Sequence, residues 1–90
     1  MKNRMTKYEC SNILGIRVNQ LNDSAPIMTH IADKHKSNNF YIAAKELYDK
    51  ALNINICRPL AEGKYYKINI QNLELPEDLK ILLDMIEEQT

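Results

Sequence analysis

The 90-residue sequence carries 12 basic and 12 acidic side chains and only two cysteines. A chain of this length forms one domain and buries only about 60–65% of the surface that its unfolded chain exposes, so its core is small. Cys10 and Cys57 lack the spacing of a zinc site and the density of an extracellular disulfide framework, so we expect two small core residues in a reducing compartment. The chain has neither an apolar run of about 18 residues nor the apolar stretch of a secretory signal, so we expect neither a membrane span nor a signal peptide.

The charges are unevenly distributed along the chain. Residues 1–37 carry six basic and three acidic side chains, whereas residues 74–90 carry six acidic side chains and one lysine. An autonomous nucleic-acid-binding protein normally has a dominant basic patch, so a formal net charge of zero argues against that class. The separation of basic and acidic residues along the chain favours a protein that docks onto another protein.

The first predicted element is a helix over residues 7–21. Thr6 and Glu9 have the spacing of a capping box, in which each side chain satisfies a backbone N–H of the other residue. Apolar residues then recur at helical spacing at Cys10, Ile13, Leu14, Val18 and Leu21. Gly15 destabilises the helix by about 1 kcal/mol relative to alanine. A glycine at this position either allows another backbone to come close or arose by drift. The sequence over 22–26 ends the helix and predicts a turn.

A second helix is predicted after a polar, solvated loop at residues 32–38. It begins near Asn39, as its N-cap, and ends near Lys50. Its apolar stripe consists of Phe40, Ala43, Ala44 and Leu47. On this pattern, Lys45 and Glu46 face solvent.

Two alternating segments predict a β-hairpin. Residues 52–56 alternate apolar and polar side chains, and residues 65–70 do so again, on either side of a turn at 59–63. Arg58 follows the first segment, where it either pairs with an acidic group of a partner or acts as an edge charge that prevents aggregation. Two strands alone are marginal in water, so the hairpin must pack on helices or on a partner.

The last predicted element is a helix that begins at Pro76 and runs to about Glu88. Proline suits the first helical position, and the acidic residues after it suit the positive end of the helix dipole. The apolar face contains Leu79, Leu82, Leu83 and Ile86, widened by Ile81 and Met85. The predicted fold is therefore a small single-domain α+β protein with the layout α-α-β-β-α.

Catalytic and metal chemistry lack the residue patterns that they need. His30 and His35, with Asp33 between them, do not have the spacing of ligands on one helix face, and no further strong ligand follows. Neither cysteine has a nucleophile–base motif, and the two glycines do not form a phosphate-binding loop. We therefore expect no catalytic residues, no metal and no cofactor, and hence no enzyme.

Short segments in a fixed order carry a resemblance to a known family. The N-terminal ones are Thr6-Lys7-Tyr8-Glu9, Ile13-Leu14-Gly15, Arg17, Gln20-Leu21 and Ala25-Pro26. The later ones are Ile42-Ala43, Lys45-Glu46-Leu47, Arg58, Leu60, Gly63 and Tyr65. Together they resemble the sixth common subunit of eukaryotic RNA polymerases, whose core is shared by archaeal subunit K and bacterial omega. The resemblance covers residues 5–73 of the single domain 1–90 and leaves 74–90 as an additional C-terminal helix.

Several positions depart from the family pattern and indicate a divergent member, from a large DNA virus or an AT-rich protist. Ser11-Asn12 replaces the usual Ala-Arg, Asn53 replaces a proline, and Cys57 replaces an arginine. The loop before the second helix is about two residues longer than usual, and the long acidic N-terminal tail of many eukaryotic members is absent. The helix after Leu73 lies outside the family core, so we expect it to add a packing surface in a complex, against a further subunit.

The resemblance implies a non-catalytic assembly subunit of a multisubunit DNA-dependent RNA polymerase, which binds the largest subunit and supports DNA-templated transcription. It implies contact with nucleic acid only through the complex, no membrane, and an intracellular location: the nucleus, or host cytoplasm or virion for a viral member. The matched residues form the expected partner interface: Thr6, Lys7, Tyr8, Glu9, Leu14, Gly15, Arg17, Gln20, Ala25, Pro26, Lys45, Glu46 and Arg58. Arg17 lies on or beside the apolar stripe of the first helix, where a buried or partner-facing guanidinium needs a carboxylate or a carbonyl. In the expected interface, we predict that charge reversal at Arg17 weakens incorporation without unfolding the free domain.

Two alternatives remain open from the sequence. The basic N-terminal third is compatible with a small nucleic-acid-binding transcription factor. The broad apolar face of the C-terminal helix is compatible with a self-associating helical adaptor.

Overall fold

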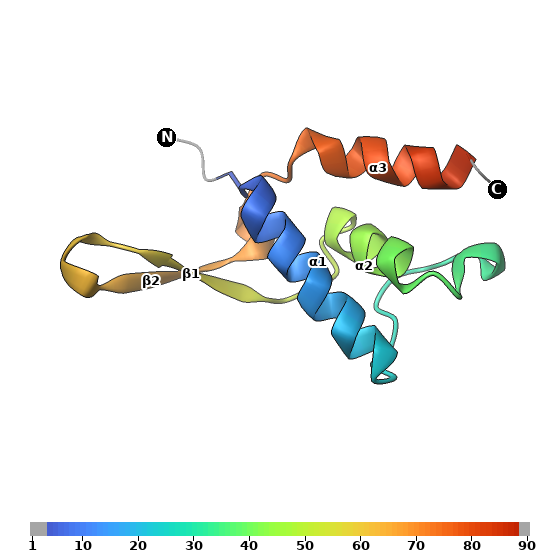
Figure 1. The fold of residues 1–90 in the computed structure, drawn as a ribbon, viewed down its shortest axis with the longest axis horizontal. Coiled ribbons are helices and arrows are strands. Elements are labelled where there is room, and N and C mark those ends of the chain that lie inside the picture. The colour runs from blue at the N-terminus through green and yellow to red at the C-terminus, as the bar shows by residue number, and fades with distance from the viewer. Residues whose placement is uncertain (1–3, 89–90) are drawn as a thin grey trace.

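Three helices and one β-hairpin form the part of the chain that the computed structural model describes, residues 4–88 (Figure 1). In chain order they are α1 (Lys7–Asn22), α2 (Asn39–Tyr48), β1 (Asn55–Pro59), β2 (Tyr65–Asn69) and α3 (Glu77–Glu88). Single 3-10 turns lie at Asp33–His35, Ala61–Gly63 and Ile70–Asn72. The predicted α+β layout is confirmed.

Helix α1 has the boundaries that its sequence predicts. At its start, the Thr6 hydroxyl accepts from the Glu9 N–H at 3.0 Å, and the Glu9 carboxylate accepts from the Thr6 N–H at 2.9 Å, so the capping box is confirmed. At its end, Ser24 adopts a left-handed conformation with φ of 70°, and the Ala25 N–H donates to the Gln20 carbonyl at 3.0 Å. This Schellman motif turns the chain sharply after the helix.

Helix α2 contacts both α1 and α3, which widens its buried face beyond the predicted stripe. Its buried residues are Tyr41, Ile42, Ala43, Ala44, Glu46 and Leu47. Phe40 is 42% exposed, so its prediction as a core residue is wrong. The N-cap is Asn38, whose side chain accepts from the Tyr41 N–H, and the predicted cap Asn39 is the first helical residue.

Strands β1 and β2 pair antiparallel, with Asn55 opposite Asn69 and Pro59 opposite Tyr65. The predicted hairpin is confirmed, but β1 begins three residues later than the alternating segment at 52–56. The hairpin extends away from the helices, which gives the described molecule a length of 48 Å (Figure 1). One face of the hairpin is half-buried through Ile56 and Ile68.

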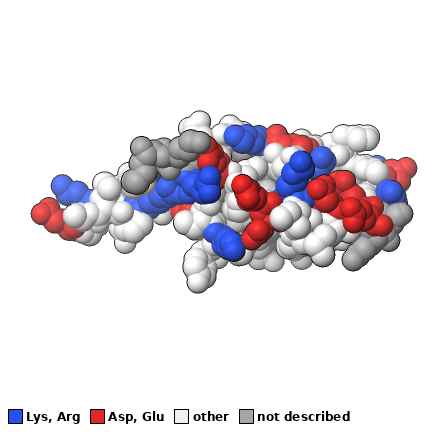
Figure 2. All heavy atoms as spheres, turned by 90° about the horizontal axis from the view of Figure 1, so that it is seen from above, with Lys and Arg blue, Asp and Glu red and all other residues white. Residues whose placement is uncertain are grey.

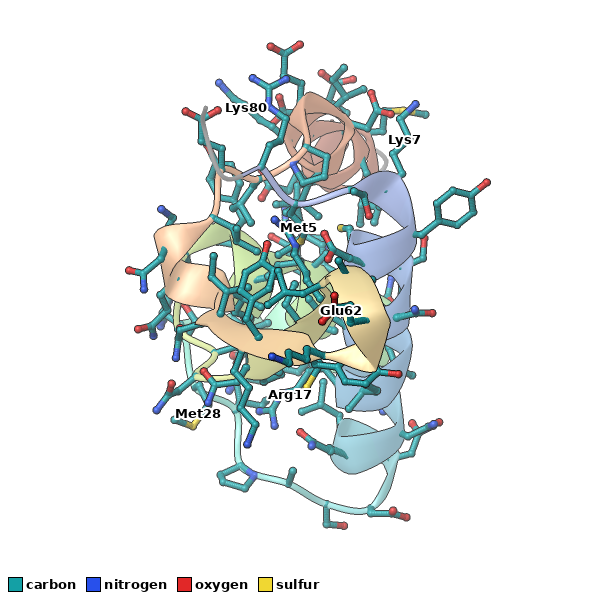
Figure 3. All side chains as sticks on the ribbon, turned by 90° about the vertical axis from the view of Figure 1, so that its left-hand side faces the viewer. Met5, Lys7, Arg17, Met28, Glu62 and Lys80 are labelled. Carbon is teal, nitrogen blue, oxygen red and sulfur yellow. The ribbon has the colours of Figure 1, made fainter. Side chains whose placement is uncertain are left out.

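Helix α3 completes the core of the chain itself. Leu79 and Leu83 are 3% and 4% exposed and pack with the helices, and Met5 lies in the interior beneath α3 (Figure 3). The Met5 N–H donates to the Glu74 carbonyl, which ties the N-terminal segment to the chain that enters α3. Helix α3 is therefore part of the domain's own core and not only an added packing surface for a complex, because α2 leaves apolar surface that α3 covers.

Candidate functional site

The N-terminal cap of α1 is also an ion-pair site. Arg58 reaches from β1 and donates through Nε and Nη2 to the Glu9 carboxylate, at 3.0 and 2.9 Å. These bonds, helped by Thr6, hold the pKa of Glu9 below its ordinary value of 4.5 against the opposing effect of burial. Hydrogen bonding to Glu9 also raises the pKa of Arg58. Arg58 thus joins the hairpin to α1 within this chain, and it is neither an unpaired edge charge nor free for an acidic partner.

The oppositely charged ends of the chain meet in the fold. Arg4 pairs with Glu74 and Lys7 pairs with Asp78, each at 3.2 Å. Figure 2 shows positive and negative side chains interspersed over the face seen from above. The polarity seen in the sequence is therefore largely neutralised within the protein rather than displayed as a basic patch.

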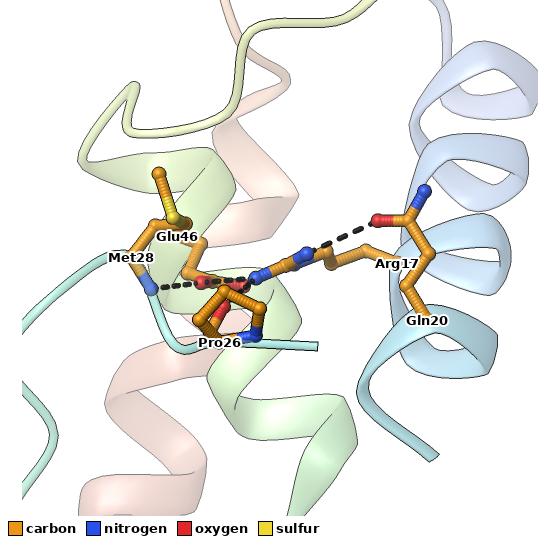
Figure 4. A network of polar contacts seen from close by, with 5 residues as sticks. All are labelled: Arg17, Gln20, Pro26, Met28 and Glu46. Carbon is orange, nitrogen blue, oxygen red and sulfur yellow. Dashed lines mark hydrogen bonds and ion pairs between the residues drawn. The ribbon is translucent and has the colours of Figure 1, made fainter. Parts of the chain in front are cut away.

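A buried network joins α1, α2 and the loop between them (Figure 4). Arg17 donates from Nε and Nη2 to the two oxygens of Glu46, at 2.7 and 2.8 Å. It also donates to the Pro26 carbonyl at 2.6 Å and to the Gln20 side chain at 3.1 Å, and the Glu46 carboxylate accepts from the Met28 N–H at 2.6 Å. The bond to Glu46 raises the pKa of Arg17.

This network corrects two expectations. The Glu46 side chain is 0% exposed, so its predicted solvent-facing position is wrong, because α1 and the loop cover that side of α2. Arg17 requires a carboxylate and a carbonyl, as predicted, but finds both within its own chain. Charge reversal at Arg17 would leave like charges buried together, so we now expect it to unfold the free domain.

An apolar groove of about 590 Å³ lies between α1, the start of α2 and α3. Its lining consists of Lys7, Cys10, Ser11, Leu14, Gly15, Val18, Asn19, Phe40, Pro76, Asp78, Leu79 and Leu82. Beyond the helix's own backbone, no described residue lies within 4 Å of the position that a Cβ on Gly15 would occupy, so no other described segment comes close to it. The groove therefore has an open floor at Gly15 and an apolar wall at Phe40.

The remaining predicted interface residues lie outside both the network and the groove. Tyr8 is 85% exposed on α1, which rules out packing in the core of this chain. Lys45 pairs with Asp49 at 3.5 Å and lies over the Tyr48 ring, whereas Ala25 is half-buried in the loop. The sequence pattern did not single out Met28, whose contribution is a backbone N–H that carries no side-chain signal.

The histidines and cysteines lie apart from one another in differing surroundings. Among the described residues, no three of His, Cys, Asp and Glu lie together as metal ligands. His35 is buried against the Tyr41 ring, with centroids 4.3 Å apart, although its segment was predicted to be a solvated loop. Both cysteines are free thiols. Cys10 is buried, and burial raises its pKa. Cys57 is exposed because its side chain points to the solvent face of β1, so its prediction as a core residue is wrong.

No helix in the described part of the chain has both the length and the apolar character needed to cross a membrane.

Comparison with known proteins identifies relatives across most of the chain. It is 35% identical to DNA-directed RNA polymerase subunit Rpo6 of Thermofilum pendens over 75 residues, which are 83% of this chain and 91% of that protein. It is 33% identical to subunit RPABC2 of DNA-directed RNA polymerases I, II and III of Schizosaccharomyces pombe, over 77% of this chain and 47% of that protein. The probable RPABC2 of Caenorhabditis briggsae is 34% identical over 81% of this chain and 51% of that protein.

The chain thus spans nearly all of the archaeal relative and about half the length of the eukaryotic ones. No family model matches it. The identity to the archaeal subunit, over almost its full length, confirms the resemblance seen in the sequence. The chain belongs to the family of DNA-directed RNA polymerase subunits that includes Rpo6 and RPABC2.

Proposed function

We propose that this chain is a non-catalytic subunit of a multisubunit DNA-directed RNA polymerase, which binds the largest subunit and stabilises the assembled enzyme. Its relatives are polymerase subunits, and the observation that carries the proposal is its match to 91% of the archaeal subunit. The described residues offer an apolar groove that a partner segment could fill. Contact with nucleic acid then occurs only through the complex, inside the cell: in the nucleus, or in host cytoplasm or virion for a viral member.

The groove supplies the physical reason to bind. Apolar surface that leaves water contributes about 25 cal/mol per Å², so a partner segment that fills the groove stabilises itself and this small domain together. Binding adds to the folding stability of the chain, and this added free energy grows as the concentration of the partner rises above the dissociation constant. The chain is thereby most stable in the assembled polymerase.

Some of the predicted interface residues have a direct role on this proposal, and others have an indirect one. Lys7, Leu14 and Gly15 line the groove, and Tyr8 lies on the same face of α1 as Gly15, about two turns before it. The Arg17 network acts indirectly, since it holds the loop after α1 against α2. The exposed side chains of Ile81 and Met85 leave α3 able to contact a further subunit.

A bulky side chain in the groove tests this proposal. The tagged full-length chain is expressed in its native source or with its polymerase subunits, and the amount that co-purifies with the polymerase is measured. Gly15→Leu places a side chain in the open floor, so we expect at least about a ten-fold loss of incorporation, which corresponds to about 1.4 kcal/mol. Asn12→Leu is the matched control, because it adds the same side chain to an exposed position of α1 outside the groove.

The possible outcomes test the proposed function and the groove as its binding surface separately. A wild-type chain that never travels with a polymerase contradicts the proposed function. A wild-type chain that incorporates, with Gly15→Leu incorporating equally well, retains the function and removes the groove as the binding surface.

A further inference from the structure

The hairpin exposes backbone groups in a defined alternation. The Ile70 N–H donates to the Ile54 carbonyl at 2.9 Å, and the Leu60 N–H donates to the Lys64 carbonyl at 2.6 Å. Hydrogen-bonded pairs alternate with non-hydrogen-bonded pairs along antiparallel strands, so every second residue pair between Ile54–Ile70 and Leu60–Lys64 is also joined by backbone hydrogen bonds. The intervening residues direct their backbone groups outward: Asn55, Cys57 and Pro59 on β1, and Tyr65, Lys67 and Asn69 on β2.

The two outer edges differ in what they offer a further strand. Pro59 has no N–H, so the outer edge of β1 lacks one donor. The outer edge of β2 keeps all of its donors, because the alternation turns the N–H groups of Tyr65 and Lys67 away from β1 and the sheet within residues 4–88 has no third strand. A two-stranded sheet is only marginally stable by itself, so a third strand at the available edge of β2 would stabilise the hairpin.

The side chains along β2 define the partner that fits. Tyr65 is 71% exposed, and Lys67 beside it on the solvent face has no ion pair among the described residues. On the opposite face, Tyr66 is 38% exposed and Ile68 is half-buried, so each has apolar surface that a third strand would cover. A neighbouring strand would therefore place acidic residues beside Lys67 and apolar residues beside Ile68.

We infer that the outer edge of β2 binds an extended segment of another polymerase subunit, which alternates acidic and apolar residues and adds a third strand to the hairpin. This inference rests on the proposed function and assigns a second contact, separate from the groove. Main-chain hydrogen bonds supply affinity in such strand addition, and the alternate side chains supply specificity. A second copy of this chain fits less well, because an antiparallel pair of β2 edges centred on Lys67 would place the two Lys67 side chains directly opposite each other, and like charges on neighbouring strands repel.

The backbone contact is tested with Tyr65→Pro against Tyr65→Ala. Proline removes only the outward N–H and leaves the hydrogen bonds of the hairpin intact, as Pro59 does opposite it. Lys64, which precedes it, already has the extended conformation that a following proline requires, with φ of −88° and ψ of 159°. We expect Tyr65→Pro to incorporate into the polymerase at least about five-fold less than Tyr65→Ala, with unchanged thermal unfolding of the free chain.

The charge contact is tested with Lys67→Glu against Lys80→Glu, which makes the same charge change on exposed α3. We expect Lys67→Glu to lower incorporation about two- to five-fold relative to Lys80→Glu, and more so at low salt. Amide hydrogen exchange gives an independent readout, since the Tyr65 and Lys67 amides should become protected only in the complex.

The inference is overturned if the wild-type chain incorporates while these two amides exchange equally fast in the complex and the free chain. Equal incorporation within both variant pairs leads to the same conclusion. A wild-type chain that does not incorporate at all contradicts the proposed function instead.

Discussion

At the scale of single residues, the most consequential feature is a buried ion pair that the helical pattern did not reveal. Arg17 lies on the apolar side of α1, and the sequence predicts that it needs a carboxylate or a carbonyl. The acceptor is Glu46, 29 residues away on α2, a helix whose buried face is wider than its apolar stripe predicts. Each partner satisfies the other, and the loop contributes the Pro26 carbonyl and the Met28 N–H.

Removing one member of this pair should destabilise the free chain strongly. Glu46→Ala leaves the Arg17 guanidinium buried and uncompensated, which costs about 3–5 kcal/mol in unfolding free energy, measured by urea denaturation. Lys45→Ala, beside it on α2, removes only a more exposed pair and should change stability by about 0.5 kcal/mol or less. A loss for Glu46→Ala no larger than that for Lys45→Ala would contradict the structural role of the pair.

The Glu9–Arg58 pair should make stability depend on pH. The folded-state pKa of Glu9 lies below its ordinary value of 4.5, so the folded protein binds this proton less readily than the unfolded chain. The stabilisation is fully present above about pH 5 to 6 and is lost as pH falls through the depressed folded-state pKa. Glu9→Gln keeps an acceptor for the cap but loses the charge, so the stability advantage of the wild type over this variant should shrink as pH falls from 7 towards 3. An advantage that does not change with pH would rule out the ion pair as its source.

At the scale of elements, α3 is the part whose role changed most between sequence and structure. Its boundaries and apolar face follow from its periodicity and from Pro76. Its partner surface does not, since an amphipathic helix has the same pattern whether it covers its own domain or another protein. The structure places it on α2, where the Tyr41 hydroxyl donates to Glu87 at 2.7 Å. Burial, together with this bond, raises the pKa of Tyr41 to about 12.

Truncation of a buried leucine in α3 should therefore unfold the free chain more easily. Leu83→Ala should lower the unfolding free energy by about 2–5 kcal/mol, because it leaves a cavity in the core. Met85→Ala, two residues further on and 53% exposed, should have an effect within about 0.5 kcal/mol. Equal effects would show that α3 does not pack on its own domain, and chemical denaturation of both variants distinguishes the cases.

At the scale of the whole molecule, folding offsets part of the charge separation of the sequence. The basic N-terminal segment lies against the acidic C-terminal one through Arg4–Glu74 and Lys7–Asp78, and Arg17 and Arg58 are paired internally. Most of the support for an autonomous nucleic-acid-binding protein is thereby removed. The self-associating adaptor loses part of its support as well, because Leu79 and Leu83 are covered within the chain.

The free chain should therefore bind duplex DNA weakly, if at all. We expect no measurable binding at about 0.15 M salt and no steep change in affinity with salt, since the formal net charge is zero and half of the basic side chains are paired with acidic ones. Fluorescence anisotropy of a labelled duplex checks this over a salt series. Tight, strongly salt-dependent binding would favour the transcription-factor alternative.

The sequence by itself determined the order of elements, the α1 cap, the hairpin and the family, because these depend on local spacing and on short motifs. Only the tertiary structure decided that Glu46 is buried with Arg17, that Arg58 pairs with Glu9, that Cys57 is exposed and that α3 belongs to the core. The physical reason is that a periodic pattern shows which faces of an element are apolar, whereas burial and ion pairing depend on which distant element covers each face.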